Sequence, residues 1–454
     1  MSIQTVNPNT NKTVKSFEEM TEKSVDAKVA KAQIAFTDWK ETSYQQRADL
    51  LHKVATLMRV KKSDLAKTIT LEMGKLLAQA EGEIDLSADI LDYYADHGET
   101  FLADKVLNPE YGTAIIRNSP IGVLLGVMPW NFPFYQVARF AAPNIMVGNT
   151  ILLKHASIVP QCAAAIEELF AEAEAPEGLY TNLFIPGHRA SVLVADKRIK
   201  GVSLTGSEEA GASVAMEAGK HLKKVVLELG GNDVFIILED ADMDKTVDWA
   251  VVGQCCVASK RFIAVEAIAD EFIQKFKDKL SKMQVGDPMD PATELGPLSS
   301  EAAAVHLADQ VKRSVDGGAK VLLGGKRADC EGAFMEPTIL TDLKPGIAAY
   351  HEELFGPVAS IYVVKDEQAA IDLANDSDFG LGGSVFTQDI ERGKRIADQI
   401  DTGMVFINHP TWTQADLPFG GTKRSGFGRE LSELGIHEFV NKKLIRVSGL
   451  NDPF

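Results

Sequence analysis

Cysteine is scarce in this chain, with four residues among 454. Four thiols are too few for a disulfide framework, and the nine histidines are scattered rather than grouped with cysteines at the spacing of a zinc site. The longest apolar run, from Ile121 to Trp130, contains two glycines and a proline and is too short to cross a bilayer. The first twenty residues also lack the apolar core of a signal peptide. These absences predict a cytoplasmic protein with reduced thiols, no bound metal ion and no membrane-spanning segment.

Positive charge is also in short supply. The chain has 47 lysines and arginines against 64 acidic residues, which gives a net charge of -17. Nucleic acids and anionic membranes bind basic surfaces, so this balance argues against both as partners, although one local arginine is enough to hold a small anionic substrate. The length predicts two or three domains, and a hydrophobic content of 45% is typical of a soluble globular protein.

The order of patterns along the chain predicts an α/β fold. Apolar residues recur at three- and four-residue spacing from Ser24 to Phe101, which indicates amphipathic scaffold helices. In residues 122–238, and again in 262–408, short apolar runs alternate with helical segments. This alternation predicts two doubly wound parallel sheets, whose ligands bind at the carboxyl ends of the strands. The dinucleotide fingerprint GxGxxG is absent, and the segment Gly206–Gly211 is only a weak phosphate-loop signal.

Two strand-like segments from distant parts of the chain predict a third unit. Residues 106–122 and 443–448 match in character, and we expect them to pair antiparallel as an exposed arm that supports a homodimer or homotetramer. The predicted boundaries are residues 1–101 and 121–227 for a cofactor-binding domain, 228–430 for a catalytic domain, and 102–120 with 431–454 for the oligomerisation arm.

A candidate reactive thiol lies near the middle of the chain, in the segment Gly253–Phe262. Small and polar residues surround Cys256 there, and Lys260 and Arg261 follow it. Nearby cations make a thiolate more available as a nucleophile. Glu228 lies among apolar residues and glycines, a setting that raises a carboxylate pKa toward that of a general base at neutral pH. Taken singly, an inert buried cysteine and a carboxylate at a strand end explain both features as well.

Five motifs in one order make the assignment more specific than any single residue does. They are WNFP at 130–133, ELGG at 228–231, GQCC at 253–256, ELFGP at 353–357 and PFGGTKRSGFGRE at 418–430. With these motifs the chain resembles the aldehyde dehydrogenase superfamily over essentially its full length. The segments KHAS and PFGGTKRSGFGRE are most similar to those of the succinate-semialdehyde dehydrogenases.

The resemblance implies a role for each catalytic residue. Cys256 is the expected nucleophile, whose thiolate attacks the aldehyde carbon to give a thiohemiacetal. The side chain of Asn131 and the Cys256 backbone N–H are expected to stabilise its oxyanion. Hydride transfer to the nicotinamide leaves a thioester, and Glu228 is expected to activate the water that releases the acid. Read without the family, Asn131 is simply a turn residue before Phe-Pro.

The resemblance also implies a cofactor site. The residues expected to contact a dinucleotide are Trp130, Lys154, Ser157, Gly206, Ser207, Glu353 and Phe355. Lys154 is expected at the adenosine ribose, and Glu353 at the nicotinamide ribose. Ser157 stands where NAD-preferring relatives often carry a glutamate that repels a 2′-phosphate, so we expect NADP to be accepted and preferred over NAD. If Ser157 is only a helix cap, the selectivity is expected to be weak.

Arg139 and Ser425 are the expected contacts of a substrate carboxylate, by the same resemblance. Arg139 lies eight residues after Asn131 on a predicted helix, which places it about two turns further on the same side. An arginine pairs well with a carboxylate, which fits succinic semialdehyde as the aldehyde substrate. The alternative is an ordinary salt-bridged arginine.

The segment Val247–Cys256 departs from the family pattern. Val251 replaces an expected asparagine, and several residues appear to be lacking between Gly253 and Gln254. Either the numbered chain omits residues that the protein has, or the segment is truly short, which would displace Cys256. We favour the first interpretation because the surrounding motifs are intact. Cys255 beside the nucleophile is either a small filler residue or a partner that traps its oxidation reversibly.

Three alternatives to the leading interpretation follow from these residues. One is an aldehyde dehydrogenase for another short or carboxylated aldehyde. Another is a cysteine hydrolase, but no motif supports His221 or His437 as its base. The last is a cofactor-binding protein without turnover, which only the short segment favours.

Overall fold

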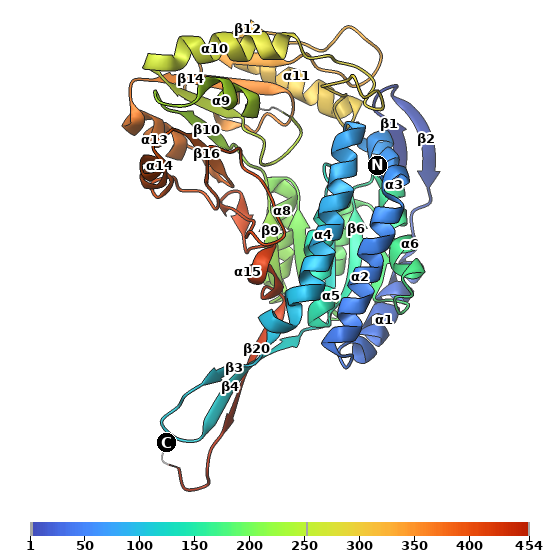
Figure 1. Cartoon of the computed structure of the whole chain (residues 1–454). Coiled ribbons are helices and arrows are strands. Elements are labelled where there is room, and N and C mark those ends of the chain that lie inside the picture. Colours follow the sequence, from blue (N-terminus) through green and yellow to red (C-terminus); the bar gives the residue numbers. More distant parts are fainter. Residues whose placement is uncertain (1–2, 251–252, 453–454) are drawn as a thin grey trace.

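The computed structural model describes residues 3–250 and 253–452. The chain forms two lobes, each built on its own β-sheet, and a thin arm that projects away from both (Figure 1). This architecture confirms the predicted fold class of two α/β units with a small β-arm. No helix in these described ranges is long and apolar enough to cross a membrane.

The first lobe is organised on a six-stranded sheet of order β19-β9-β8-β5-β6-β7. All neighbours are parallel except β19, which runs antiparallel to β9. The strands are β5 (Val123–Met128), β6 (Thr150–His155), β7 (Tyr180–Asn182), β8 (Ile199–Thr205), β9 (Lys224–Glu228) and β19 (Gly426–Phe427). Every residue of β6 is buried, as expected for a parallel strand covered on both faces.

The helices of the first lobe lie on both faces of this sheet. Those that follow its strands are α5 (Tyr135–Val147), α6 (Pro160–Glu172), α7 (Gly187–Val194) and α8 (Glu208–Lys220). The amino-terminal part adds β1 (Ile3–Asn7), β2 (Lys12–Phe17), α1 (Glu22–Trp39), α2 (Tyr44–Val60), α3 (Lys62–Met73) and α4 (Leu77–Leu102). Helix α5 is buried all round, because it lies against the sheet beneath α2 and α4.

The second lobe is organised on a seven-stranded sheet of order β12-β13-β14-β11-β10-β16-β17. Its strands are β10 (Val234–Ile237), β11 (Arg261–Val265), β12 (Lys320–Leu323), β13 (Thr338–Thr341), β14 (Val358–Val364), β16 (Gly383–Phe386) and β17 (Phe406–Ile407). Its helices are α9 (Met243–Trp249), α10 (Glu266–Ser281), α11 (Glu301–Asp316), α12 (Ala348–His351), α13 (Glu367–Asn375) and α14 (Ile390–Ala397). Two further short strands, β15 (Phe379–Gly380) and β18 (Thr422–Lys423), form a separate two-stranded antiparallel sheet.

The arm is a three-stranded sheet of order β20-β4-β3. Its strands are β3 (Lys105–Leu107), β4 (Thr113–Pro120) and β20 (Val440–Val447), and β20 pairs antiparallel with β4 over its whole length. The pairing predicted between the two distant segments is therefore present, and the arm extends from the first lobe (Figure 1).

Two segments do not lie where the predicted domain boundaries put them. Strand β19 joins the sheet of the first lobe, although residues 426–430 were assigned to the catalytic domain. Helix α15 (Ser432–Ile436) packs against α4 and α5 instead of extending into the arm. Leu431, Ile436 and Phe439 belong to the core of the first lobe, which explains why the chain returns there before β20 begins.

Candidate active site

Residues 253–260, here called the thiol loop, connect α9 to β11 in the second lobe and pack against the first. Cys256 and Val257 contact the apolar core of the first lobe. The Cys256 carbonyl oxygen lies close to Gly231, where an added Cβ would come within 2.6 Å of it. Because Gly231 follows Glu228 by three residues, the thiol loop lies directly against the ELGG turn that ends β9.

The connection into this loop is short in the protein itself. The sequence runs continuously from α9, which ends at Trp249, to Cys256 seven residues later, so no residues have been omitted between them. The interpretation that we favoured from the sequence is therefore wrong. Val251, where the family pattern has an asparagine, lies outside the described residues.

Buried polar contacts hold the thiol loop at both of its ends. At its start, the Gln254 side chain accepts a hydrogen bond from Ser299 N at 2.9 Å and donates one to Pro297 O at 3.4 Å. At its end, the Lys260 ammonium donates to the carbonyl oxygens of Cys255 (2.9 Å), Cys256 (2.8 Å) and Ala258 (3.1 Å).

The Lys260 ammonium also forms an ion pair with Glu353, 3.0 Å from its Oε1. Both side chains are largely buried, so the pair is weakly screened by solvent. From the sequence alone, Lys260 is only a cation near the thiol. Its contacts show a second role, which is to fix the peptide groups of the loop.

The two adjacent thiols titrate as a pair. The pKa of Cys255 is lowered to about 7, first because the Cys256 thiol hydrogen bonds to its thiolate and then because Lys260 supplies positive charge. The same hydrogen bond and burial raise the pKa of the Cys256 thiol. The proton equilibria of the two thiols therefore depend on each other. Arg139 and Lys260 both favour the thiolate form of Cys256.

Glu228 lies at the carboxyl end of β9 and is almost completely buried, with 2% of its surface exposed. Neither of its carboxylate oxygens has a hydrogen-bond partner among the described residues. Burial raises its pKa well above the ordinary value, and the positive charge of Arg139 opposes that effect only partly. A carboxylate in this setting is suited to take a proton from water at neutral pH.

Asn131 lies in the turn between β5 and α5, at the same edge of the sheet as Glu228. It is buried, and its Oδ1 has no hydrogen-bond partner in the described part of the chain. A buried amide oxygen without an intramolecular partner is unusual, and a catalytic site is one of the places where such groups are found.

Four side chains of the described residues form polar contacts with the Arg139 guanidinium. Its guanidinium is 1% exposed and forms an ion pair with Glu430. It also donates to Tyr135 Oη at 3.1 Å, Gln136 Oε1 at 2.7 Å and Thr205 Oγ1 at 3.1 Å. The salt-bridged alternative considered for this arginine is the arrangement observed, and the predicted contact with a substrate carboxylate stays a prediction.

Ser425 is also engaged internally. Its hydroxyl donates to Gly230 O at 2.6 Å and accepts from Gly380 N at 3.0 Å, and the residue is fully buried. It thereby connects the ELGG turn to the loop 418–430, which is a structural role that the sequence did not reveal.

The residues predicted for a cofactor lie along the carboxyl ends of the first sheet and face Glu353. The ring of Trp130 meets Phe355 edge to face, with centroids 5.6 Å apart. Glu353 accepts a hydrogen bond from Gly231 N at 3.2 Å. Gly206 N donates to Glu228 O at 3.0 Å, and Ser207 is the N-cap of α8. These contacts, with the ion pair between Lys260 and Glu353, bring Trp130, Phe355 and Glu353 close to the thiol loop.

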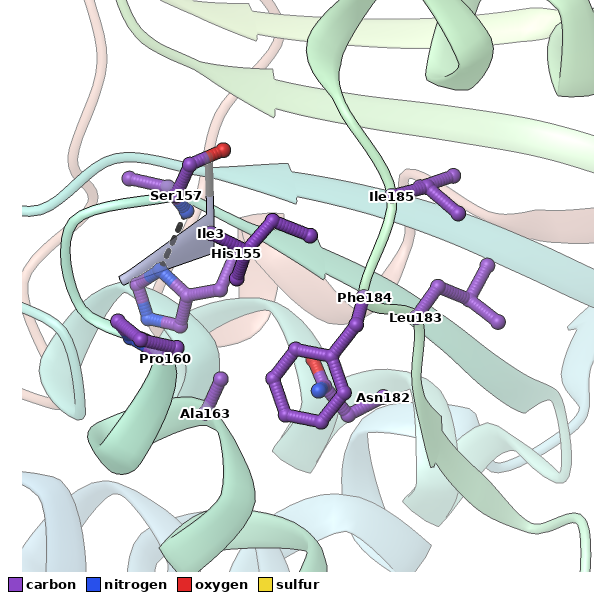
Figure 2. Close-up of a pocket in the computed structure, with 10 residues that line it drawn as sticks. Ile3, His155, Ser157, Pro160, Ala163, Asn182, Leu183, Phe184 and Ile185 are labelled. Carbon is purple, nitrogen blue, oxygen red and sulfur yellow. Dashed lines mark hydrogen bonds between the residues drawn. The ribbon is translucent and has the colours of Figure 1, made fainter. Parts of the chain in front are cut away.

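Lys154 is the penultimate residue of β6 and is buried, and no side chain among the described residues forms an ion pair with it. Burial alone lowers its pKa. Ser157 follows in the next turn, beside a small hollow lined by His155 and residues 182–185 (Figure 2). The backbone oxygen of Ser157 accepts from Gln4 N at 3.1 Å, so strand β1 fixes this turn.

His155 connects this turn to the WNFP motif, and the sequence analysis did not single it out. Its Nε2 lies 2.9 Å from Pro133 O, and its Nδ1 accepts from Ala156 N at 2.9 Å. These contacts require the neutral imidazole with its proton on Nε2. Burial, opposed in part by the Pro133 hydrogen bond, lowers its pKa to about 4.

We expect the His155→Gln variant to show how this histidine links stability to pH. A histidine whose folded-state pKa lies below its unfolded value contributes stability that is present above about pH 6.5 and is lost as the pH falls toward 4. The advantage of His155 over the non-titrating glutamine should therefore shrink by about 2 kcal/mol between pH 7.5 and pH 5. Urea unfolding at the two pH values measures it. His188→Gln, at an exposed site, should change stability by less than about 0.5 kcal/mol at either pH, and an equal effect there would contradict the account.

Comparison with known proteins agrees with this geometry. Residues 1–445 match the model of the aldehyde dehydrogenase family. A succinate-semialdehyde dehydrogenase [NADP(+)] of Deinococcus radiodurans is 52% identical over 97% of this chain and 94% of its own. A probable succinate-semialdehyde dehydrogenase [NADP(+)] of Synechocystis is 45% identical over 99% of this chain and all of its own.

A solved crystal structure resembles this chain in both sequence and fold. The succinic semialdehyde dehydrogenase of Streptococcus pyogenes, crystallised with NADP+, is 45% identical, covers 98% of this chain and all of its own, and superposes with a TM-score of 0.96. The chain belongs to the aldehyde dehydrogenase family.

Proposed function

We propose that the protein oxidises succinic semialdehyde to succinate with reduction of NADP. The observation that carries this proposal is the buried carboxylate of Glu228, which has no hydrogen-bond partner among the described residues, beside a thiol loop whose carbonyl groups Lys260 holds. The similar relatives and the solved structure that are named for this reaction supply its substrate and its cofactor.

In the proposed mechanism the Cys256 thiolate attacks the aldehyde carbon and forms a thiohemiacetal. The Asn131 side-chain amide and the Cys256 N–H donate to the developing oxyanion, where buried, fixed donors act strongly. Bound NADP would supply the acceptor for the hydride that the thiohemiacetal carbon loses. Glu228 then removes a proton from the water that attacks the thioester, and its raised pKa allows the protonated form to persist near neutral pH.

The residues present fit a bound NADP. Lys154 is a buried cation without an ion-pair partner among the described residues, which suits a phosphate or ribose oxygen. Ser157 adds a hydroxyl donor and no negative charge. The amino terminus of α8, capped by Ser207, favours an anion such as the pyrophosphate. Glu353 would accept from a ribose hydroxyl, beside Trp130 and Phe355.

Arg139 and Ser425 are proposed contacts of the distal carboxylate of the substrate. Four of the five guanidinium N–H groups face Glu430, Gln136, Thr205 and Tyr135, so Arg139 would reach the carboxylate through its second Nη1–H, or after the hydrogen bond to the Tyr135 hydroxyl opens. Tyr135, which also lies 2.7 Å from Thr413 Oγ1, would then offer its hydroxyl to the same carboxylate.

The first experiment is steady-state reduction of NADP by the purified protein with succinic semialdehyde, acetaldehyde, butanal and glutaric semialdehyde. We expect the four-carbon semialdehyde to give the highest kcat/KM. Cys256→Ser should lower kcat by about 10³-fold or more, and Cys255→Ser, the matched control, by less than about 10-fold. A higher kcat/KM for another aldehyde would show that the proposed substrate, succinic semialdehyde, is wrong. NADP binding without turnover on any aldehyde would overturn the proposed enzyme activity.

Cofactor selectivity is expected to depend on the charge at position 157. Ser157→Glu should lower kcat/KM for NADP by about 10- to 100-fold while that for NAD changes by less than about 3-fold, because the new carboxylate repels a 2′-phosphate. Ser157→Ala is the control for loss of the hydroxyl alone and should cost NADP less than about 10-fold. Equal losses for both cofactors in the glutamate variant would contradict this role.

We further propose that the arm supports a homodimer or homotetramer. Strand β20 is an edge strand that exposes Leu444 (61%) and Val447 (63%), and β3 adds the exposed Val106. Light scattering after size exclusion should give an oligomer for the parent protein and a monomer for Leu444→Lys combined with Val447→Lys. Val60→Lys, at an equally exposed apolar residue on α2, should leave the oligomer intact. A parent protein that is monomeric at all concentrations would rule the proposal out.

A further inference from the structure

A buried ion pair lies behind the turn that carries Asn131. The side chain of Lys75, just before α4, pairs with Glu83 in the second turn of that helix, and the two are 7% and 0% exposed. Desolvation of both ions opposes a buried pair, so such a pair is weak evidence for stability. The remaining contacts of the two side chains point to another role.

The second oxygen of Glu83 holds the start of α5. Its Oε1 accepts hydrogen bonds from Phe134 N at 2.8 Å and Tyr135 N at 3.2 Å. Helix α5 has no side-chain cap of its own at Phe134, so a carboxylate from α4 satisfies these amides. Negative charge is favourable at this end of a helix, and the contact fixes the residues that follow the WNFP turn.

Lys75 holds the other side of the same turn. Its ammonium lies 3.3 Å from the centroid of the Phe132 ring, and Phe132 follows Asn131 directly. A cation–π contact is stronger when the cation is desolvated, as Lys75 is here. The ion pair therefore contacts residues 132, 134 and 135. The Oδ1 of Asn131 itself has no hydrogen-bond partner among the described residues.

The segment that carries Lys75 also touches the anchor of the thiol loop. An added Cβ at Gly74 would come within 2.8 Å of the Pro297 ring, and Pro297 O accepts the hydrogen bond from Gln254. Cys255 is among the groups that favour the charged form of Lys75. One segment of the first lobe thus reaches both the turn of the oxyanion donor and the thiol loop.

We propose that Lys75 and Glu83 are positioning residues that hold Asn131 where its amide meets the oxyanion. The inference rests on the proposed aldehyde oxidation for its kinetic consequence and on these contacts for its geometry. Neither residue touches the substrate. Lys75 acts through the Phe132 ring and Glu83 through the Phe134 and Tyr135 amides, so their effect on the rate should vanish when the Asn131 amide is absent.

The test is a double-mutant cycle of Lys75→Met with Asn131→Ala, read as kcat and KM for succinic semialdehyde. Lys75→Met alone should lower kcat by about 10- to 100-fold with KM changed by less than about 3-fold, since a donor displaced by about an ångström loses most of its effect. In the Asn131→Ala background the same change should cost less than about 3-fold. An equal loss in both backgrounds would mean a merely structural role and would overturn the proposal.

Lys62→Met is the matched control. Lys62, on α3, forms an exposed ion pair with Asp85 of α4, the helix that also carries Glu83, and the two charged groups are 3.0 Å apart. It should change kcat by less than about 2-fold. Glu83→Gln, which keeps an acceptor for the α5 amides, is the second variant if Lys75→Met does not fold, and it should give the same pattern of kinetics at smaller amplitude.

Crystal structures of the parent and of Lys75→Met separate this inference from the proposed function. A displaced Asn131 side chain in the variant supports the positioning role even if no aldehyde is oxidised by the parent, in which case only the proposed function fails. An unmoved Asn131 overturns the positioning role even if the parent is fully active.

Discussion

The ammonium group of Lys260 holds the candidate active site together. Helix α9 ends seven residues before Cys256 and does not include the thiol loop. The loop is held instead by Lys260, which donates to three of its carbonyl groups and pairs with Glu353. A buried cation is tolerated only when its donors are satisfied, and these four oxygens satisfy them. The nearby carboxyl of Asp233, whose pKa is raised to about 6 by burial, adds negative charge near Lys260.

The sheets determine which residues can meet this cation. Parallel strands present their carboxyl ends at one edge, and Glu228, Asn131 and Lys154 come from the ends of β9, β5 and β6. Glu353 reaches the same edge from the second lobe and accepts from Gly231. The site therefore lies where the two lobes contact each other, and the hydrogen bonds of Ser425 keep the 418–430 loop against it.

Much of this organisation is predictable from the sequence. The alternation of apolar runs with helical segments predicts the two sheets. The similar strand-like character of residues 106–122 and 443–448 predicts the arm, because strand pairing depends on the residue pattern within each strand. The boundary near residue 431 is not predictable in this way, since α15 turns back to fill a gap between α4 and α5. The short segment before Cys256 was misinterpreted, because intact motifs on both sides do not report the length between them.

Side-chain partners are the part that a single sequence conceals. Nothing in the helical pattern of α5 indicates that Arg139 pairs with Glu430, nearly three hundred residues away. The capping of α5 by Glu83 is hidden for the same reason, because the acceptor comes from another helix. Motif resemblance identified Cys256, Glu228 and Asn131 as candidates, but their exposure, their missing partners and the coupling of Cys256 to Cys255 required coordinates.

The central claim is that the thiol loop presents Cys256, despite its short connection, as the thiol that carries the acyl group. The most direct measurement traps that intermediate: the Glu228→Gln variant is mixed with NADP and succinic semialdehyde, quenched in acid, and mapped by peptide mass spectrometry. The account predicts a succinyl thioester on Cys256, since the variant lacks the base that hydrolyses it. A thioester on Cys255, or none on either thiol while NADP remains bound, would contradict it.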